Sequence, residues 1–119
     1  MSSIVESNSA AFSSGQFADT YDSMSEIIVW NLVGSALIEG KSEVIAFCEK
    51  MSREMEGSEL TNTQQIVDGN LVAVQGFCRY IKAGIPSQLF YCDVYQFEDN
   101  QIISITSYAI EAATNPHAE

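Results

Sequence analysis

The segment Gln88–Ile110, QLFYCDVYQFEDNQIISITSYAI, has the pattern of two long strands joined by a tight turn. Its first half, Leu89–Phe97, is rich in aromatic and β-branched residues, and its second half, Ile102–Ile110, alternates β-branched residues with Ser, Thr and Tyr. The polar residues between them, EDNQ at 98–101, include the Asp and Asn that hairpin turns favour. The segment therefore predicts a β-hairpin with two long arms.

One residue of this hairpin does not fit a purely structural strand. Asp93 lies in mid-strand, where the two-residue repeat puts it on the same face as Tyr91, Tyr95 and Phe97. A carboxylate among aromatic rings is costly to bury unless it is neutralised or hydrogen-bonded. Asp93 is therefore the leading candidate for a functional residue. The pattern also allows two structural interpretations. In one, Asp93 is ionised and hydrogen-bonded to tyrosine hydroxyls or water, and in the other, it faces solvent.

Composition limits the class of protein. The 119 residues, 46% of them hydrophobic, fit one globular domain spanning residues 1–119. The net charge of −11, from 16 acidic and 5 basic residues, argues against nucleic acid and against an anionic membrane surface as partners. No apolar run approaches the roughly 18–20 residues that span a bilayer, and the N-terminus lacks the pattern of a secretory signal. Three cysteines without a close pair indicate reduced thiols, so we expect a cytoplasmic protein.

The rest of the chain predicts two short helices, one strand, a central helix and then further strands. The 3–4 spacing of Val44, Phe47, Cys48, Met51 and Met55 predicts a central helix that ends at Gly57. The other expected elements are, in chain order, short helices at Ile4–Phe12 and Gln16–Met24, a strand at Glu26–Leu32, an extended link at Ala36–Glu39, a strand at Glu59–Val67, a hairpin turn at 68–70, a strand at Leu71–Lys82 and a loop at Ala83–Ser87.

Helices segregated from an antiparallel sheet make an α+β fold. A sheet of long strands must curl around the helices to bury their apolar faces, and Gly76 is the position where a bend or bulge costs least. Such a curl leaves a concave face, and concave apolar space with few polar groups is where small molecules bind. We therefore expect a curved sheet with an internal pocket.

The order of these elements resembles the nuclear-transport-factor-2-like superfamily, which includes ketosteroid isomerases, SnoaL-like polyketide cyclases and limonene epoxide hydrolases. The resemblance rests on VWNLVGSALIEGKSEVIAFCEKM at residues 29–51 and YCDVYQFEDNQIISITSYAI at residues 91–110. It implies a cone-shaped α+β fold, in which a curved antiparallel sheet wraps about three helices and encloses a pocket. It also implies a homodimer formed through the outer face of the sheet.

Within this superfamily, the local likeness is to ketosteroid isomerase, whose catalytic carboxylate also precedes a Val-Gly-Ser segment. The resemblance puts Asn31 at the position of the proton-shuttling base, Asp93 at that of the oxyanion-holding Asp, and Asn8 near that of the helix tyrosine. Asn31 cannot take up a proton at neutral pH and can only orient a carbonyl, hydroxyl or water. Asp93 would donate a hydrogen bond if apolar surroundings kept it protonated, as they do in ketosteroid isomerase.

Strand parity and the isomerase's spacing extend the candidate site. Phe77, Arg79 and Ile81 would face outward and form the dimer face. Three tyrosines are among the residues expected to bind the ligand, and the alternative for them is that they are core aromatics whose hydroxyls are satisfied internally. The residues expected to bind the ligand are Trp30, Val74, Cys78, Tyr80, Tyr91, Tyr95 and Ile105.

Other chemistries lack the residues they need. The one histidine, His117, leaves no Ser–His–Asp triad, few zinc sites and no activating base for Cys78. No glycine-rich phosphate loop occurs, so neither a cofactor nor a metal is expected. Two hypotheses remain. The first is an isomerase- or cyclase-type enzyme that polarises the carbonyl of a small apolar ligand through Asp93. The second is a non-catalytic binding or dimerisation module of the same fold.

Overall fold

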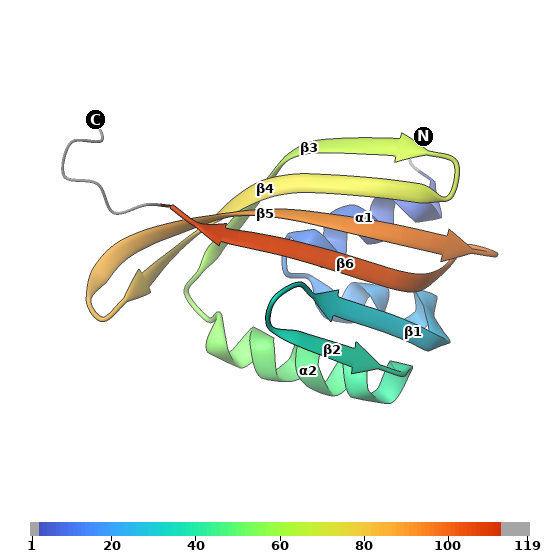
Figure 1. Ribbon diagram of the computed structural model, residues 1–119, viewed down its shortest axis with the longest axis horizontal. Helices are drawn as coiled ribbons and strands as arrows, with labels where there is room; N and C mark the ends of the chain where they lie inside the picture. The colour runs from blue at the N-terminus through green and yellow to red at the C-terminus, as the bar shows by residue number, and fades with distance from the viewer. Residues whose placement is uncertain (1–2, 113–119) are drawn as a thin grey trace.

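The computed structural model describes residues 3–112, in which helices and strands follow the expected order. Three helices precede or interrupt the first strands, and a four-strand meander follows them (Figure 1). In chain order the elements are α1 (Ile4–Ser13), the 3₁₀ helix η1 (Phe17–Ser23), β1 (Met24–Leu32), β2 (Ala36–Glu39), α2 (Lys41–Glu54), β3 (Glu59–Asp68), β4 (Leu71–Lys82), β5 (Ile85–Glu98) and β6 (Gln101–Glu111).

The six strands form one curved, unclosed sheet in the order β2-β1-β6-β5-β4-β3. Neighbouring strands are antiparallel except β1 and β6, which are parallel. The predicted extended link at 36–39 is a strand, because it pairs with β1. In Figure 1, α1 lies behind the middle of the sheet and α2 runs beside β1 and β2. The α+β cone expected from the sequence is confirmed. None of the helices within residues 3–112 is long and apolar enough to cross a membrane.

The pairing of β3 with β4 is irregular next to Gly76, where the sequence predicted a bend or a bulge. The pairing of β3 with β4 shifts register between Asn62 and Gln64, directly beside the Asn62–Gly76 pair. A Cβ atom on Gly76 would run into the Thr61 carbonyl oxygen and would lie 2.6 Å from Cζ of Tyr91. The missing side chain therefore lets the β3 backbone and the Tyr91 ring approach β4 closely.

The three hairpin turns of the meander each have two residues, and the first, Gly69-Asn70, lies where the sequence predicted a turn. The turn between β5 and β6 is Asp99-Asn100, with φ of 51° and 62°, as its sequence predicted. The predicted loop at Ala83–Ser87 is wrong, because Ala83 and Gly84 alone make the turn and β5 starts at Ile85. Pro86 is tolerated in β5 because that end of the strand pairs only with β4, so one edge needs no donor.

The core fills the space between the helices and the middle of the sheet. Phe12 of α1 contacts Phe17 and Trp30, with ring centroids 4.8 and 4.9 Å apart. Val44 and Cys48 of α2 are fully buried against the same core. The aromatic cluster stops short of the β4–β5 end of the sheet, and the concave face is hollow there.

Candidate ligand-binding site

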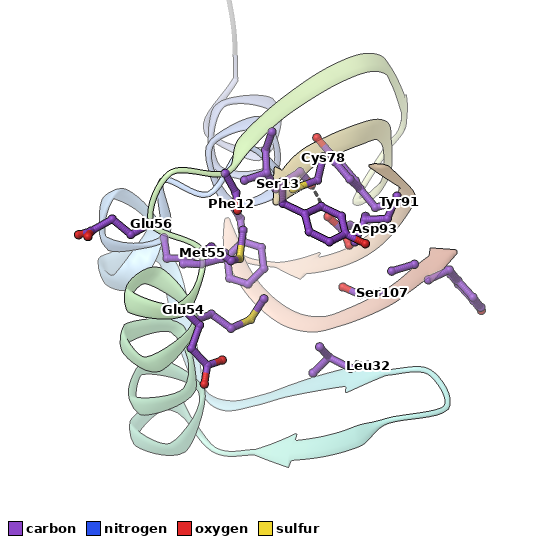
Figure 2. Close-up of a pocket in the computed structure, with 18 of the residues that line it drawn as sticks. Phe12, Ser13, Leu32, Glu54, Met55, Glu56, Cys78, Tyr91, Asp93 and Ser107 are labelled. Carbon is purple, nitrogen blue, oxygen red and sulfur yellow. Dashed lines mark hydrogen bonds between the residues drawn. The ribbon is translucent and has the colours of Figure 1, made fainter. Parts of the chain in front are cut away.

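The hollow end of the concave face is a cavity of about 490 Å³. It opens between the end of α2 and the β4–β5 hairpin, where Ile81 is 68% exposed, and Tyr108 of β6, which also lines it, is 47% exposed. Its walls are mainly aromatic and aliphatic side chains, namely Phe12, Phe17, Trp30, Leu32, Met51, Met55, Leu60, Leu89 and Tyr91. The polar side chains in its deeper part are Ser13, Asp93 and Ser107. Figure 2 shows Ser13, Cys78, Tyr91 and Asp93 on one side and the end of α2 on the other.

Asp93 is 8% exposed and receives a hydrogen bond from the last residue of α1. The Ser13 hydroxyl donates to Oδ2 of Asp93 over 2.7 Å and is also hydrogen-bonded to the Tyr95 hydroxyl. Because a serine hydroxyl carries one proton, Tyr95 must donate to Ser13. The result is a relay that runs from Tyr95 through Ser13 to Asp93.

The two ends of α1 hold Ser13 at this point. Ser3 and Glu6 form a capping box that starts the helix. The chain leaves the helix at Gly15, whose φ of 90° suits glycine. The helix thus ends with the Ser13 hydroxyl over the concave face of β5.

A second relay approaches Asp93 from β6 and β1. Nε1 of Trp30 donates to the Ser107 hydroxyl oxygen over 2.9 Å. Ser107 pairs with Asp93 across β5 and β6, and its own proton is free to be donated to the carboxyl. Trp30 and Tyr95 therefore both direct protons toward Asp93 through a serine.

Burial raises the pKa of Asp93, and hydrogen bonds from Ser107 and Ser13 oppose that rise. No salt bridge involves Asp93 within residues 3–112. A buried carboxyl without a cation is favoured in its protonated form. Asp93 can therefore act either as a hydrogen-bond donor or as an acceptor at the floor of the cavity.

Tyr91 forms a fixed wall of the cavity. Its hydroxyl donates to Oδ1 of Asn62 over 2.7 Å, and Nδ2 of Asn62 donates to the Ala10 carbonyl oxygen over 2.9 Å. This chain links β5, β3 and α1. Burial raises the pKa of Tyr91, with the nearby Asp93 adding to the effect. Its hydroxyl is already engaged, so Tyr91 offers the cavity mainly its ring.

Five of the candidate site residues line the cavity: Trp30, Cys78, Tyr80, Tyr91 and Asp93. Tyr80 lies at the mouth, where its hydroxyl donates to Oε2 of Glu111 over 2.6 Å. Burial raises the pKa of the Cys78 thiol, which keeps it protonated. The other three ligand-binding candidates, Val74, Tyr95 and Ile105, have side chains fully buried in the hydrophobic core.

The expectation that Asn31 faces the site is wrong. Asn31 is exposed on the outer face of β1, while its neighbours Trp30 and Leu32 line the cavity. The register puts Leu32 beside Ser107, which in turn pairs with Asp93. Alternation along the strand therefore gives the inward position nearest to Asp93 to an aliphatic side chain.

Ser13 and Ser107 are site residues that the sequence analysis missed. The signal for Ser107 was present, because β6 alternates and Ile105 was already assigned to the concave face. Ser13 carried no such signal, since it lies in a Ser-Ser-Gly break after an amphipathic helix. Among residues 3–112, no three His, Cys, Asp or Glu side chains gather as a metal site would require.

Comparison with known proteins identifies relatives of the whole fold. The SnoaL-like domain family matches residues 5–105. An NTF2-like protein of unknown function from Cytophaga hutchinsonii is 42% identical, with a TM-score of 0.88 over 90% of this chain and 96% of that one. No curated protein sequence matches.

Two more distant structures share the fold. A candidate SnoaL-like polyketide cyclase from Jannaschia is 15% identical, with a TM-score of 0.72 over 89% of this chain and 85% of that one. A candidate ketosteroid isomerase from Kribbella flavida is 18% identical, with a TM-score of 0.72 over 96% of this chain and 81% of that one. At these identities the likeness concerns the fold alone.

Proposed function

This chain belongs to the SnoaL-like domain family, and we propose that it binds a small, mainly apolar molecule of carbonyl type with Asp93 as the polar anchor. The observation that carries the proposal is a nearly buried carboxyl that faces an apolar cavity, with no cation of residues 3–112 beside it. Protonated Asp93 would donate a hydrogen bond to the ligand carbonyl, and the ring of Trp30 would contact its apolar part. Pockets of this size and composition suit ligands of that kind.

The proposal includes carbonyl polarisation, as an isomerase or cyclase would use it, but no proton abstraction by the protein. Asn31 lies outside the cavity, and the inward neighbour of Ser107 on β1 is Leu32, which takes up no proton. Glu54 and Glu56, which lie at the mouth, are exposed. The family's non-catalytic alternative, a binding module that kept the pocket, differs from this proposal only in whether the bound ligand reacts.

A thermal-shift screen of apolar ketones tests the proposal. A ligand that binds only the folded protein raises its stability, by about 2.7 kcal/mol when the ligand is present at a hundred times its Kd. We expect a ketone that fits the cavity to raise the Tm of the wild type and to lose most of this effect in Asp93→Asn. The matched control is Asp99→Asn, the same chemical change in the exposed β5–β6 turn.

The same screen contains the result that would refute the proposal. An equal shift of wild type and Asp93→Asn by every active ketone would mean that Asp93 is not the anchor. If none of the compounds raises the Tm, the ligand-binding proposal is contradicted and the dimerisation module is the favoured hypothesis.

We also propose a homodimer formed through the outer face of the sheet. Phe77, Phe90 and Ile110 are register partners on three neighbouring strands, and Phe90 and Ile110 are 51% and 72% exposed. An apolar row of this kind, exposed at Phe90 and Ile110 and half-buried at Phe77, is typical of protein interfaces. We expect a dimer by light scattering and a monomer after Phe90→Glu. A wild type that stays monomeric at high micromolar concentration would refute the dimer.

A further inference from the structure

In both relays that approach Asp93, the hydrogen bonds are donated in the direction of its carboxyl group. Tyr95 donates to Ser13, which donates to Oδ2 of Asp93, and Trp30 donates to Ser107 on the opposite strand. An ionised carboxylate only accepts hydrogen bonds, so donors arriving from both sides suit its charged form. A protonated Asp93, in contrast, has to place its own proton elsewhere, and the cavity is the open direction.

The cavity has no protein cation to balance this charge. Its lining residues, all within the described part of the chain, include no Lys, Arg or His. Four of the basic side chains instead pair with surface acids, as Lys41–Glu26, Lys50–Glu54, Arg79–Glu59 and Lys82–Glu111. An unpaired buried carboxylate is costly, which is why burial alone disfavours the ionised form here. A ligand cation would supply the missing charge.

The surroundings of Asp93 also favour a cation over an anion. The rings of Phe12, Phe17, Trp30 and Tyr91 line the cavity, and aromatic faces attract cations. The chain as a whole carries a net charge of −11. Its field therefore draws cations toward the mouth and repels anions.

We propose that the cavity accepts a second ligand class, protonated hydrophobic amines, whose ammonium group hydrogen-bonds to the Asp93 carboxylate while the apolar part contacts the aromatic walls. The proposal rests on the proposed function in one respect, that the cavity is the ligand site and Asp93 its anchor. It goes beyond that function in the ligand, because Asp93 here accepts hydrogen bonds and carries charge, whereas a ketone requires it to donate.

Three ligands built on one ring skeleton separate the two classes. The neutral probe is 2-indanone, the cationic probe is 2-aminoindane, and the anionic probe is indane-2-carboxylate. We would measure their affinities by calorimetry near neutral pH, with wild type, Asp93→Asn and the turn control Asp99→Asn. We expect 2-aminoindane to bind wild type and Asp99→Asn alike and to lose about tenfold or more in Asp93→Asn, as for a charge-assisted hydrogen bond. The carboxylate should bind most weakly.

A second measurement compares ligands on the wild type alone, so its result does not depend on whether Asp93→Asn folds. The carboxyl carbon of Asp93, followed by NMR in the wild type, should report the ionised form with 2-aminoindane bound and the protonated form with 2-indanone bound. Wild-type selectivity for the amine over the carboxylate is a further test that uses no substitution.

The outcomes distinguish the two proposals. Binding of 2-indanone without 2-aminoindane overturns the amine proposal and leaves the proposed function intact. Equal affinity of wild type and Asp93→Asn for the amine, or binding of the carboxylate as tight as that of the amine, also overturns it. Binding of the amine alone supports it and overturns the carbonyl class. Failure of every probe overturns both.

Discussion

Replacing Gly76 with alanine would add a methyl group at the most crowded point of the concave face. Its Cβ would meet the Thr61 carbonyl oxygen and the Tyr91 hydroxyl, and would lie 2.6 Å from Cζ of Tyr91, where ordinary contacts begin at 3.4 Å. The Tyr91 ring would have to withdraw by about 0.8 Å. Such a movement would strain or break its hydrogen bond to Asn62.

The expected cost is a sum of three effects. Overpacking of a core position costs about 1–3 kcal/mol, and a lost internal hydrogen bond costs about 0.5–1.5 kcal/mol. Against these, alanine restricts the unfolded chain more than glycine does, which returns about 0.4–1 kcal/mol where the backbone conformation is compatible. Gly76 does not have positive φ, so this gain applies. The three effects together give a net loss of about 0.5–4 kcal/mol, with a central value of about 2 kcal/mol. The central value corresponds to a fall in Tm of roughly 6–10 °C for a domain of this size.

Urea unfolding followed by circular dichroism measures this loss in wild-type and Tyr91→Ala backgrounds. Because Tyr91 supplies one of the two obstacles, Gly76→Ala should cost less in the Tyr91→Ala background, with a coupling of about 1 kcal/mol. The reasoning is refuted if Gly76→Ala costs less than about 0.5 kcal/mol, the scale of an ordinary surface substitution. It is refuted equally if the cost is the same in both backgrounds.

Three further predictions concern the polar floor of the cavity. Ser13→Ala leaves the fully buried Tyr95 hydroxyl without its partner and should cost about 1–3 kcal/mol in urea unfolding, whereas Ser14→Ala should cost much less. Folding raises the pKa of Asp93. The protonated Asp93 carboxyl therefore contributes fully to the stability of the protein below the pKa of the unfolded state, and this contribution is lost as pH rises through the pKa of the folded state. The Tm of Asp93→Asn should therefore gain on that of wild type as pH rises above about 4, the ordinary pKa of an aspartate, and a constant difference would contradict the assignment. Trp30, the one tryptophan of the chain, should change its fluorescence emission when a ligand fills the cavity. A saturating ligand that leaves the emission unchanged would place the ligand elsewhere.

Much of the fold could be predicted because its signals are local. The alternation of Ile102–Ile110 and the Asp99-Asn100 pair define a hairpin without reference to the rest of the chain. Gly76 marked the irregular pairing of β3 with β4 for a similar reason, since a glycine inside a long strand often coincides with a bulge or a sharp bend. The inward parity of Asp93 also followed from its own strand.

The errors arose where long-range pairing determines the outcome. The parallel pairing of β1 with β6 joins strands that no short turn connects, so neither strand carries a sign of it. Asn31 was assigned to the site from its distance to a Val-Gly-Ser segment, but its facing depends on the alternation of β1 around Trp30. Ser13 became a site residue only because α1 ends over β5, a tertiary fact invisible in its neighbours.

The measurement that bears most directly on Asp93 as the anchor of a ligand pocket is a carboxyl-carbon NMR titration of Asp93, free and with 2-indanone, assigned with Asp93→Asn. We predict that free Asp93 titrates above the ordinary Asp value of about 3.9. We also predict that the bound ketone raises its pKa further, because the ketone accepts a hydrogen bond only from the protonated form. Titration of Asp93 near its ordinary value, unchanged by the ketone, would contradict the account.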